Sequence, residues 1–109
     1  MRFFRHLCRY FESMAKDALG VDLSVRRSKL PYRLDGRCCY TNGRFEIRIC
    51  RDLDENTAIM VLIHEVAHVW SWEYEDHGDE WGLAYAMIYR IMLRLLKEKR
   101  DAGRDKKDC

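Results

Sequence analysis

The spacing of apolar side chains changes along the chain, and the change separates predicted helices from predicted strands. Residues 2–18 repeat apolar positions every three or four residues, and Gly20 follows as a stop signal. Residues 21–27 instead alternate apolar with polar side chains, which is typical of a strand buried on one face. We therefore expect an N-terminal amphipathic helix followed by a strand.

Two further strands are predicted on either side of a tight turn. Residues 37–41 and 44–50 flank Asn42 and Gly43, the pair best suited to the positive φ angles of a two-residue hairpin. The second arm alternates as well, because Phe45 and the isoleucines after it are separated by polar residues. The three segments together predict a three-stranded antiparallel sheet.

The longest apolar stretch predicts a second helix that ends near Trp72 and is the most buried element of the fold. Asp52 or Asp54 is expected to cap its start, and Asp52 with Glu55 has the form of a capping box. A last helix is predicted to open at Asp79. The expected fold is α+β, with a helix, the three-stranded antiparallel sheet and two further helices.

Length and composition bound the domain organisation. A chain of 109 residues with 48% hydrophobic residues supports one core, which we place in a single domain over residues 1–98. Residues 99–109 are almost entirely charged and are expected to form a tail without regular structure. The net charge of +2 gives no strong case for a nucleic-acid or membrane partner.

The remaining composition indicates a cytoplasmic protein. No apolar run approaches the roughly 18 residues that cross a bilayer, and arginines interrupt the apolar N-terminus, so no membrane contact is expected. The five cysteines form no C-x-x-C pair and are interpreted as free thiols in a reducing cytosol. We expect a soluble monomer.

The second helix carries the sequence H-E-x-x-H at residues 64–68. Residues four apart share a helical face, so the imidazoles of His64 and His68 can bind one metal ion with Glu65 beside it. A carboxylate next to a metal-bound water is the arrangement of metal-assisted hydrolysis, with Glu65 as the general base. The competing interpretation is that both histidines are core residues and Glu65 is a solvated helix residue.

A catalytic zinc takes three protein ligands and leaves one position for water. His77 is the expected third ligand, because the loop before it lets the chain turn back toward the helix. Nearby carboxylates compete for this position, and Glu80 would serve in a thermolysin-like arrangement. The other competitors are Glu75, Asp76 and Asp79. The sequence identifies no oxyanion donor, and Tyr74 and Tyr85 are candidates only because they are near the motif in sequence.

Residues 64–68 together with His77-Gly78-Asp79-Glu80-Trp81 resemble the SprT-like, Spartan-related metallopeptidases. The pattern of that family is H-E-x-x-H, a loop, and H-G-x-x-aromatic, and the resemblance covers about residues 44–96. It implies a small zincin-like fold with His64, His68 and His77 as zinc ligands and Glu65 as catalytic base. Asp79 stands where the family often has Pro, and the zinc ribbon of many members is missing.

The resemblance extends to the small stand-alone metallopeptidases of phages and bacteria, which implies a location in the cytoplasm, and in the host cytoplasm if the protein is phage-encoded. The expected function is zinc-dependent hydrolysis of peptide bonds in a protein or peptide, including proteins associated with nucleic acid. The strand from Phe45 to Cys50 is expected to hold the substrate by edge pairing.

The alternative function is a non-catalytic, zinc-stabilised module that binds nucleic acid or another partner. In that reading, arginines of the first helix and the strands would contact DNA. The arginines concerned are Arg2, Arg5, Arg9, Arg26, Arg27, Arg48 and Arg51.

Overall fold

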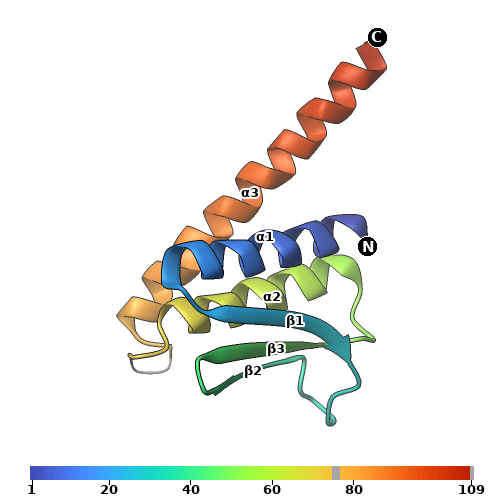
Figure 1. The fold of residues 1–109 in the computed structure, drawn as a ribbon. Coiled ribbons are helices and arrows are strands. Elements are labelled where there is room, and N and C mark those ends of the chain that lie inside the picture. The colour runs from blue at the N-terminus through green and yellow to red at the C-terminus, as the bar shows by residue number, and fades with distance from the viewer. Residues whose placement is uncertain (75–76, 109) are drawn as a thin grey trace.

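The computed structural model describes residues 1–74 and 77–108, with side chains described as far as Gly103. Helices and strands follow one another in the expected order (Figure 1). The elements are α1 (Arg2–Leu19), β1 (Asp22–Ser28), β2 (Gly36–Thr41), β3 (Arg44–Cys50), α2 (Glu55–Trp70) and α3 (Asp79–Asp108). The predicted α+β class is confirmed, and α1 and α2 lie on the same face of the sheet.

The sheet is mixed, so the prediction of three antiparallel strands is wrong in part. The strand order is β1-β3-β2, with β1 parallel to β3 and β2 antiparallel to β3. The predicted hairpin is present, since Asn42 and Gly43 have φ angles of 52° and 78°. After β1 the chain crosses the end of the sheet through residues 29–35, so β2 forms on the far side and β3 returns between the two.

The central place of β3 overturns its predicted role as a substrate-binding edge. Both sides of β3 are occupied by neighbouring strands, because Ile47 pairs with Val25 of β1 and with Cys38 of β2. The outer side of β1 faces α1, where the Glu12 carboxylate accepts a hydrogen bond of 2.9 Å from the Val25 N–H. The edge strand that runs beside α2 is therefore β2.

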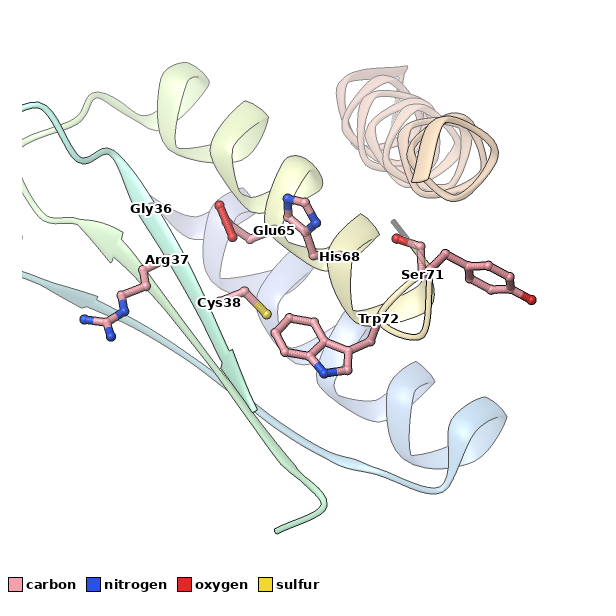
Figure 2. Close-up of a pocket in the computed structure, with 8 residues that line it drawn as sticks. Gly36, Arg37, Cys38, Glu65, His68, Ser71 and Trp72 are labelled. Atoms are coloured by element: carbon pink, nitrogen blue, oxygen red, sulfur yellow. The ribbon is translucent and has the colours of Figure 1, made fainter. Parts of the chain in front are cut away.

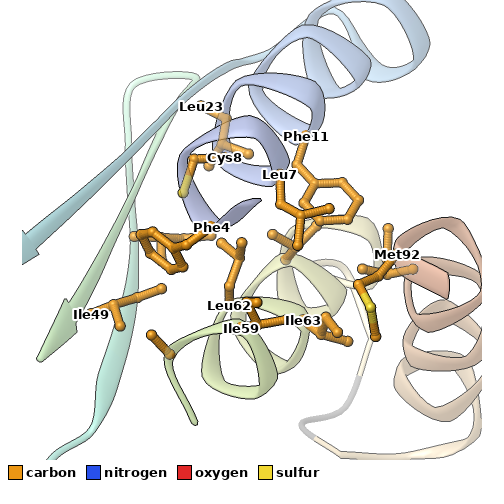
Figure 3. Packing of buried hydrophobic residues seen from close by; sticks show 14 of the residues in the cluster. Phe4, Leu7, Cys8, Phe11, Leu23, Ile49, Ile59, Leu62, Ile63 and Met92 are labelled. Atoms are coloured by element: carbon orange, nitrogen blue, oxygen red, sulfur yellow. The ribbon is translucent and has the colours of Figure 1, made fainter. Parts of the chain in front are cut away.

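The core fills the space between the sheet and the helices (Figure 3). Apolar side chains of α1 point toward α2, while the sheet, with Ile49 of β3, closes the core on the left of this view and α3, with Met92, closes it on the right. Fully buried members include Leu7, Phe11, Ile47, Ile49, Leu62, Ile63 and Ile88. Half of the residues of α2 are buried, which confirms it as the most buried helix. Each large apolar side chain contributes about 1.5–3 kcal/mol by its burial.

Asp54 caps α2, and the predicted capping box of Asp52 with Glu55 is wrong. The Asp54 carboxylate accepts hydrogen bonds from the N–H and the hydroxyl of Thr57. These bonds hold the pKa of the Asp54 carboxyl below its usual value. Glu55 is the first helical residue, and its carboxylate accepts a 3.3 Å hydrogen bond from the Phe4 N–H instead. Glu55 thus ties α2 to the start of α1.

Arg27 fixes the connection between β3 and α2. Its guanidinium donates to the Cys50 carbonyl at 3.1 and 2.8 Å and to the Leu53 carbonyl at 2.8 Å. The same guanidinium lies over the Phe4 ring, 5.2 Å from its centroid. Arg27 is therefore engaged within the fold and does not belong to the arginines that could meet a nucleic acid.

The helix α3 continues to Asp108, where composition predicted a tail without regular structure from residue 99. Charged residues with high helix propensity can extend a helix without burial, and Arg94 pairs with Glu98 one turn later at 3.9 Å. Lys99 still contacts the body of the protein, with its ammonium 5.3 Å from the Phe3 ring centroid. The domain boundary at residue 98 stays a prediction, and Cys109 lies outside the described residues.

Within the described residues, no helix has both the length and the apolar character needed to cross a bilayer.

Candidate metal centre

Three histidines meet at the end of α2. His64 and His68 lie one turn apart on the same face, with their Nε2 atoms 3.3 Å apart. His77, from the loop before α3, brings its Nε2 to within 3.1 Å of the His64 Nε2. One ligand atom from each of the three lies within 4.8 Å of the others. The structure thus brings together the histidines that the motif and the loop predicted.

The spacing of these nitrogens fits a metal ion. Zinc binds imidazole nitrogen at about 2.0–2.1 Å, so two ligand nitrogens at tetrahedral positions stand roughly 3.3 Å apart. The two measured separations, 3.1 and 3.3 Å, match this value. Three imidazoles are suited to zinc and to several other first-row ions. The cluster can therefore hold a metal ion through three ligands.

The competing carboxylates that the structure describes do not belong to this group. Among the described residues, the metal-compatible cluster contains only the three histidines, and Glu80 and Asp79 are exposed on the first turn of α3. Glu75 and Asp76, the remaining competitors, lie outside the described residues.

The loop that delivers His77 turns sharply. The helix α2 ends at Trp70, earlier than predicted, and the Ser71 hydroxyl donates a 2.8 Å hydrogen bond back to the Ala67 carbonyl. His77 itself has a φ angle of 57°, in the left-handed region that side chains other than glycine rarely adopt. Such a backbone costs on the order of 1 kcal/mol or more and persists where the surroundings impose it.

Trp81 packs against all three histidines. Its ring centroid lies 5.1 Å from that of His64, 5.8 Å from His68 and 4.8 Å from His77, where the two rings are perpendicular. Its indole N–H also donates to the His64 carbonyl at 3.4 Å. Trp81 is the aromatic residue of the H-G-x-x-aromatic segment, and sequence reasoning assigned it no role of its own. It holds the three imidazoles from the side of α3.

Glu65 faces a cleft beside the histidines (Figure 2). Its residue exposure is 8%, and it lines a space of about 400 Å³ together with His68 and the edge strand β2. A Cβ at Gly36 of β2 would lie 2.4 Å from Val61 Cγ1 and 3.3 Å from Glu65 Cγ. The edge strand and the predicted base can approach each other because position 36 has no side chain.

The sequence analysis did not identify Gly36, because a glycine between two predicted strands carries no signal that a helix approaches it closely. The sequence analysis also assigned no role in the site to Cys38, which lines the cleft. Burial, with the Glu65 carboxylate and Cys39 adding to it, raises the pKa of the Cys38 thiol to about 12. Cys38 therefore presents a neutral thiol to the cleft at physiological pH.

The other residues of the sequence analysis lie around this centre or away from it. Tyr74 lines the cleft, whereas Tyr85 is absent from its described lining and lies beside Trp81, 5.2 Å between ring centroids. His6 lies on α1 against Phe3, away from the cluster. The expectation of free thiols is confirmed for the described cysteines, Cys8, Cys38, Cys39 and Cys50.

A helix that carries H-E-x-x-H beside a small sheet, with a third histidine returned by the following loop, is the arrangement of a metallopeptidase-like fold. The chain belongs to the SprT-like family, whose family model matches residues 2–101. Searches of the curated proteins and of the solved structures returned no match.

Proposed function

We propose that this protein is a zinc-dependent peptidase. The observation that carries the proposal is a cleft lined by His68 of the three-histidine cluster, by the buried Glu65 and by the edge strand β2. Membership of the SprT-like family supports the same conclusion. The assigned zinc ligands are His64, His68 and His77, and the assigned catalytic base is Glu65.

A bound zinc ion would supply a Lewis acid and lower the pKa of a water at the open ligand position. The side chains of this chain perform the remaining tasks. Glu65, beside the ligand His64 in sequence and buried at the cleft, accepts the proton of the attacking water and delivers it to the leaving amine. Trp81 keeps the imidazoles in place. Tyr74 is the better placed of the two candidate oxyanion donors, because it lines the cleft.

The substrate is assigned to the edge of β2, in place of the strand that the sequence suggested. An edge strand offers unpaired backbone N–H and C=O groups to an extended peptide. Gly36 and Cys38 of β2 line the cleft with Glu65, so a peptide paired along this strand passes directly beside the proposed base.

The test is proteolysis of an unfolded protein with and without stoichiometric zinc. The zinc-loaded protein is expected to bind one ion per chain and to cleave, while Glu65→Gln keeps the ion and loses activity by at least about a hundredfold. His77→Ala is expected to lose the ion. Glu80→Gln is the matched control, because Glu80 lies close in sequence and outside the cluster. Full activity in Glu65→Gln, or a zinc-free protein, would contradict the proposal.

A second candidate function is contact with nucleic acid, and a row of arginines on the sheet favours it. Arg48 of β3 pairs with Arg26 of β1 on one side and with Arg37 of β2 on the other. Ile47 and Ile49, on either side of Arg48, are buried in the core, so the alternation along the strands places the three arginines on the opposite face of the sheet. No described helix covers that face (Figure 1). Neighbouring strands stand about 4.8 Å apart, so like charges in such a row repel one another unless an anion is near.

Glu46, on the same face of the sheet, offsets part of the positive charge of the three arginines. Its carboxylate accepts a 2.7 Å hydrogen bond from Arg48 and lies 3.9 Å from Arg26. The hydrogen bond from Arg48 holds the pKa of the exposed Glu46 carboxyl below its usual value. One carboxylate for three guanidinium groups leaves a positive row that phosphates can neutralise.

Binding to single-stranded and duplex DNA at several salt concentrations tests this second candidate. Replacing Arg26, Arg37 and Arg48 by Gln is expected to reduce the slope of log affinity against log salt by about 0.7–0.9 for each phosphate that the variant no longer neutralises. The control replaces Arg2, Arg5 and Arg9 on the exposed side of α1. DNA binding without any cleavage would favour a non-catalytic module, and DNA that stimulates cleavage would join the two functions. Equal salt slopes in both triple variants would contradict the role of the row.

A further inference from the structure

A second cavity, of about 390 Å³, lies next to the cleft of the metal centre. Its walls are apolar and aromatic, formed by the end of α1, the end of β2 and the turn after α2. Trp72 and Tyr74 line both cavities, so they form the boundary between them. Glu73 is the one charged residue of its described lining.

The boundary residue Trp72 is both exposed and fixed in orientation. Its ring centroid lies 5.9 Å from that of Tyr40 and 5.3 Å from that of Phe45, and the Phe45 contact is perpendicular. Tyr40 and Phe45 also contact each other, at 4.7 Å. Even so, Trp72 and Tyr40 keep exposures of 43% and 46%. An exposed aromatic surface held by other aromatic rings is suited to bind an apolar group at low entropic cost.

The edge strand leads from one cavity to the other. Gly36 and Cys38 line the cleft with Glu65, and Tyr40 lines the second cavity. Figure 2 shows Cys38 pointing toward α2 and Arg37 pointing to the other side of the strand. Tyr40, two residues after Cys38, shares the face of Cys38 by alternation. A peptide paired with β2 has the same alternation, so its inward side chains recur every two residues, about 6.7 Å apart. Successive inward side chains therefore meet first Trp72 and then the second cavity.

We infer that the substrate is an extended segment with large apolar side chains at alternate positions on one side of the scissile bond. These positions lie two and four residues from the residue opposite Gly36, where Cys38 and Tyr40 stand on β2. The inference rests on the proposed peptidase function. Segments with this pattern are half-buried strands in folded proteins, so the site selects chains that have lost their fold.

Two matched peptides test the inference, identical except that Phe and Leu at the alternate positions of one become Ser in the other. Zinc-loaded wild-type protein is expected to cleave the apolar peptide with a kcat/KM at least about tenfold higher. Trp72→Ala should reduce this preference to about twofold, and Trp72→Phe should keep most of it. Tyr32→Ala is the matched control, because Tyr32 is an aromatic residue with 89% exposure that lines neither cavity.

Binding of the same peptides to the Glu65→Gln variant separates this inference from the proposed chemistry. The fluorescently labelled apolar peptide is expected to bind about tenfold more tightly than the Ser peptide, and Trp72→Ala should remove the difference. If wild type cleaves both peptides equally, or prefers the Ser peptide, the inference is wrong and the peptidase function stands. If the apolar peptide binds selectively and nothing is cleaved, the subsite stands and the peptidase function is wrong.

Discussion

Gly36 sets the distance between the edge strand and the proposed base. Alanine at this position would place a methyl group 2.4 Å from Val61 Cγ1, and Val61 has little freedom because it is β-branched and helical. We expect Gly36→Ala to destabilise the fold by about 1–3 kcal/mol and to lower kcat/KM at least tenfold. Zinc affinity should stay unchanged, which an equilibrium metal titration measures.

Two further variants make this prediction specific. Gly82→Ala is the control, since a Cβ at Gly82 meets nothing within 4 Å and alanine favours a helix. The double variant Gly36→Ala with Val61→Ala removes the clashing methyl group and should recover part of the activity. An active, stable Gly36→Ala protein would show that the strand and α2 do not need this close approach.

Cys8 is predicted to make stability fall at alkaline pH. Burial, with Glu12 adding to it, raises the pKa of the Cys8 thiol from 9.0 to about 12. The folded state keeps the thiol neutral, so its contribution is fully present below pH 9 and is lost as the pH rises from 9 toward 12. The loss is at most about 1.4 kcal/mol for each pH unit.

Urea unfolding of wild type and Cys8→Ala between pH 8 and pH 11 measures this effect. The free energy of unfolding should fall less steeply in the variant, whatever its stability at pH 8. Cys38→Ala should show a similar change of slope, since the pKa of that thiol is also raised to about 12. Parallel curves for wild type and Cys8→Ala would contradict the prediction.

Among the elements, the position of α2 depends on Arg27 of β1. Arg27→Ala would remove three hydrogen bonds to the carbonyls of Cys50 and Leu53, where the chain passes from β3 into α2. We expect a loss of about 2–3 kcal/mol in urea unfolding, because these are hydrogen bonds from a charged donor to half-buried groups. Arg27→Lys should recover only part of the lost free energy of unfolding, since an ammonium cannot reproduce the planar, forked set of N–H donors of a guanidinium.

Arg26→Ala is the control for this prediction. Arg26 is the adjacent residue on β1, its side chain is 60% exposed, and its nearest carboxylate partner is 3.9 Å away. Its removal should change stability by no more than about 0.5 kcal/mol. If Arg27→Ala and Arg26→Ala lowered the free energy of unfolding equally, Arg27 would act by its charge alone.

At the scale of the whole molecule, the histidine cluster joins α2 to the loop before α3. Zinc that binds the folded state through His64, His68 and His77 should stabilise it by about 2.7 kcal/mol at a hundred times the dissociation constant. For a domain of this size, we expect Tm to rise by about 10 °C or more. A chelator should reverse the rise, and His77→Ala should abolish most of it.

Thermal unfolding of the two proteins with and without zinc provides the measurement. The matched comparison is Glu65→Gln, which keeps all three ligands and should respond to zinc like the wild type. A Tm that zinc leaves unchanged would argue against a site that spans the two helices.

Local patterns predicted the elements of the fold well, because periodicity and turn residues act over a few positions. The helix at residues 2–18, the Asn42-Gly43 hairpin and the start of α3 at Asp79 all appear in the structure. The order of the strands could not be predicted in this way. It depends on contacts between distant segments: β3 lies between β1 and β2 and runs parallel to β1, which no local pattern specifies.

The candidate site shows the same difference between features set by local sequence and features set by contacts between distant segments. His64 and His68 follow from helical spacing, and His77 follows from a loop short enough to return. Gly36 and Trp72 could not be found from sequence, because their roles come from the approach of β2 to α2. The positions of these two residues in the sequence, relative to H-E-x-x-H, do not indicate that they lie near the motif in space.

The open edge of β2 also bears on how two copies of the chain meet. Backbone groups that accept an extended peptide would accept the β2 of a second copy equally well. An antiparallel pairing by two-fold symmetry, centred near Arg37, would set the two Arg37 side chains opposite each other. Like charges at such positions repel. In that register, the charge of Arg37 disfavours the pairing of two copies through β2.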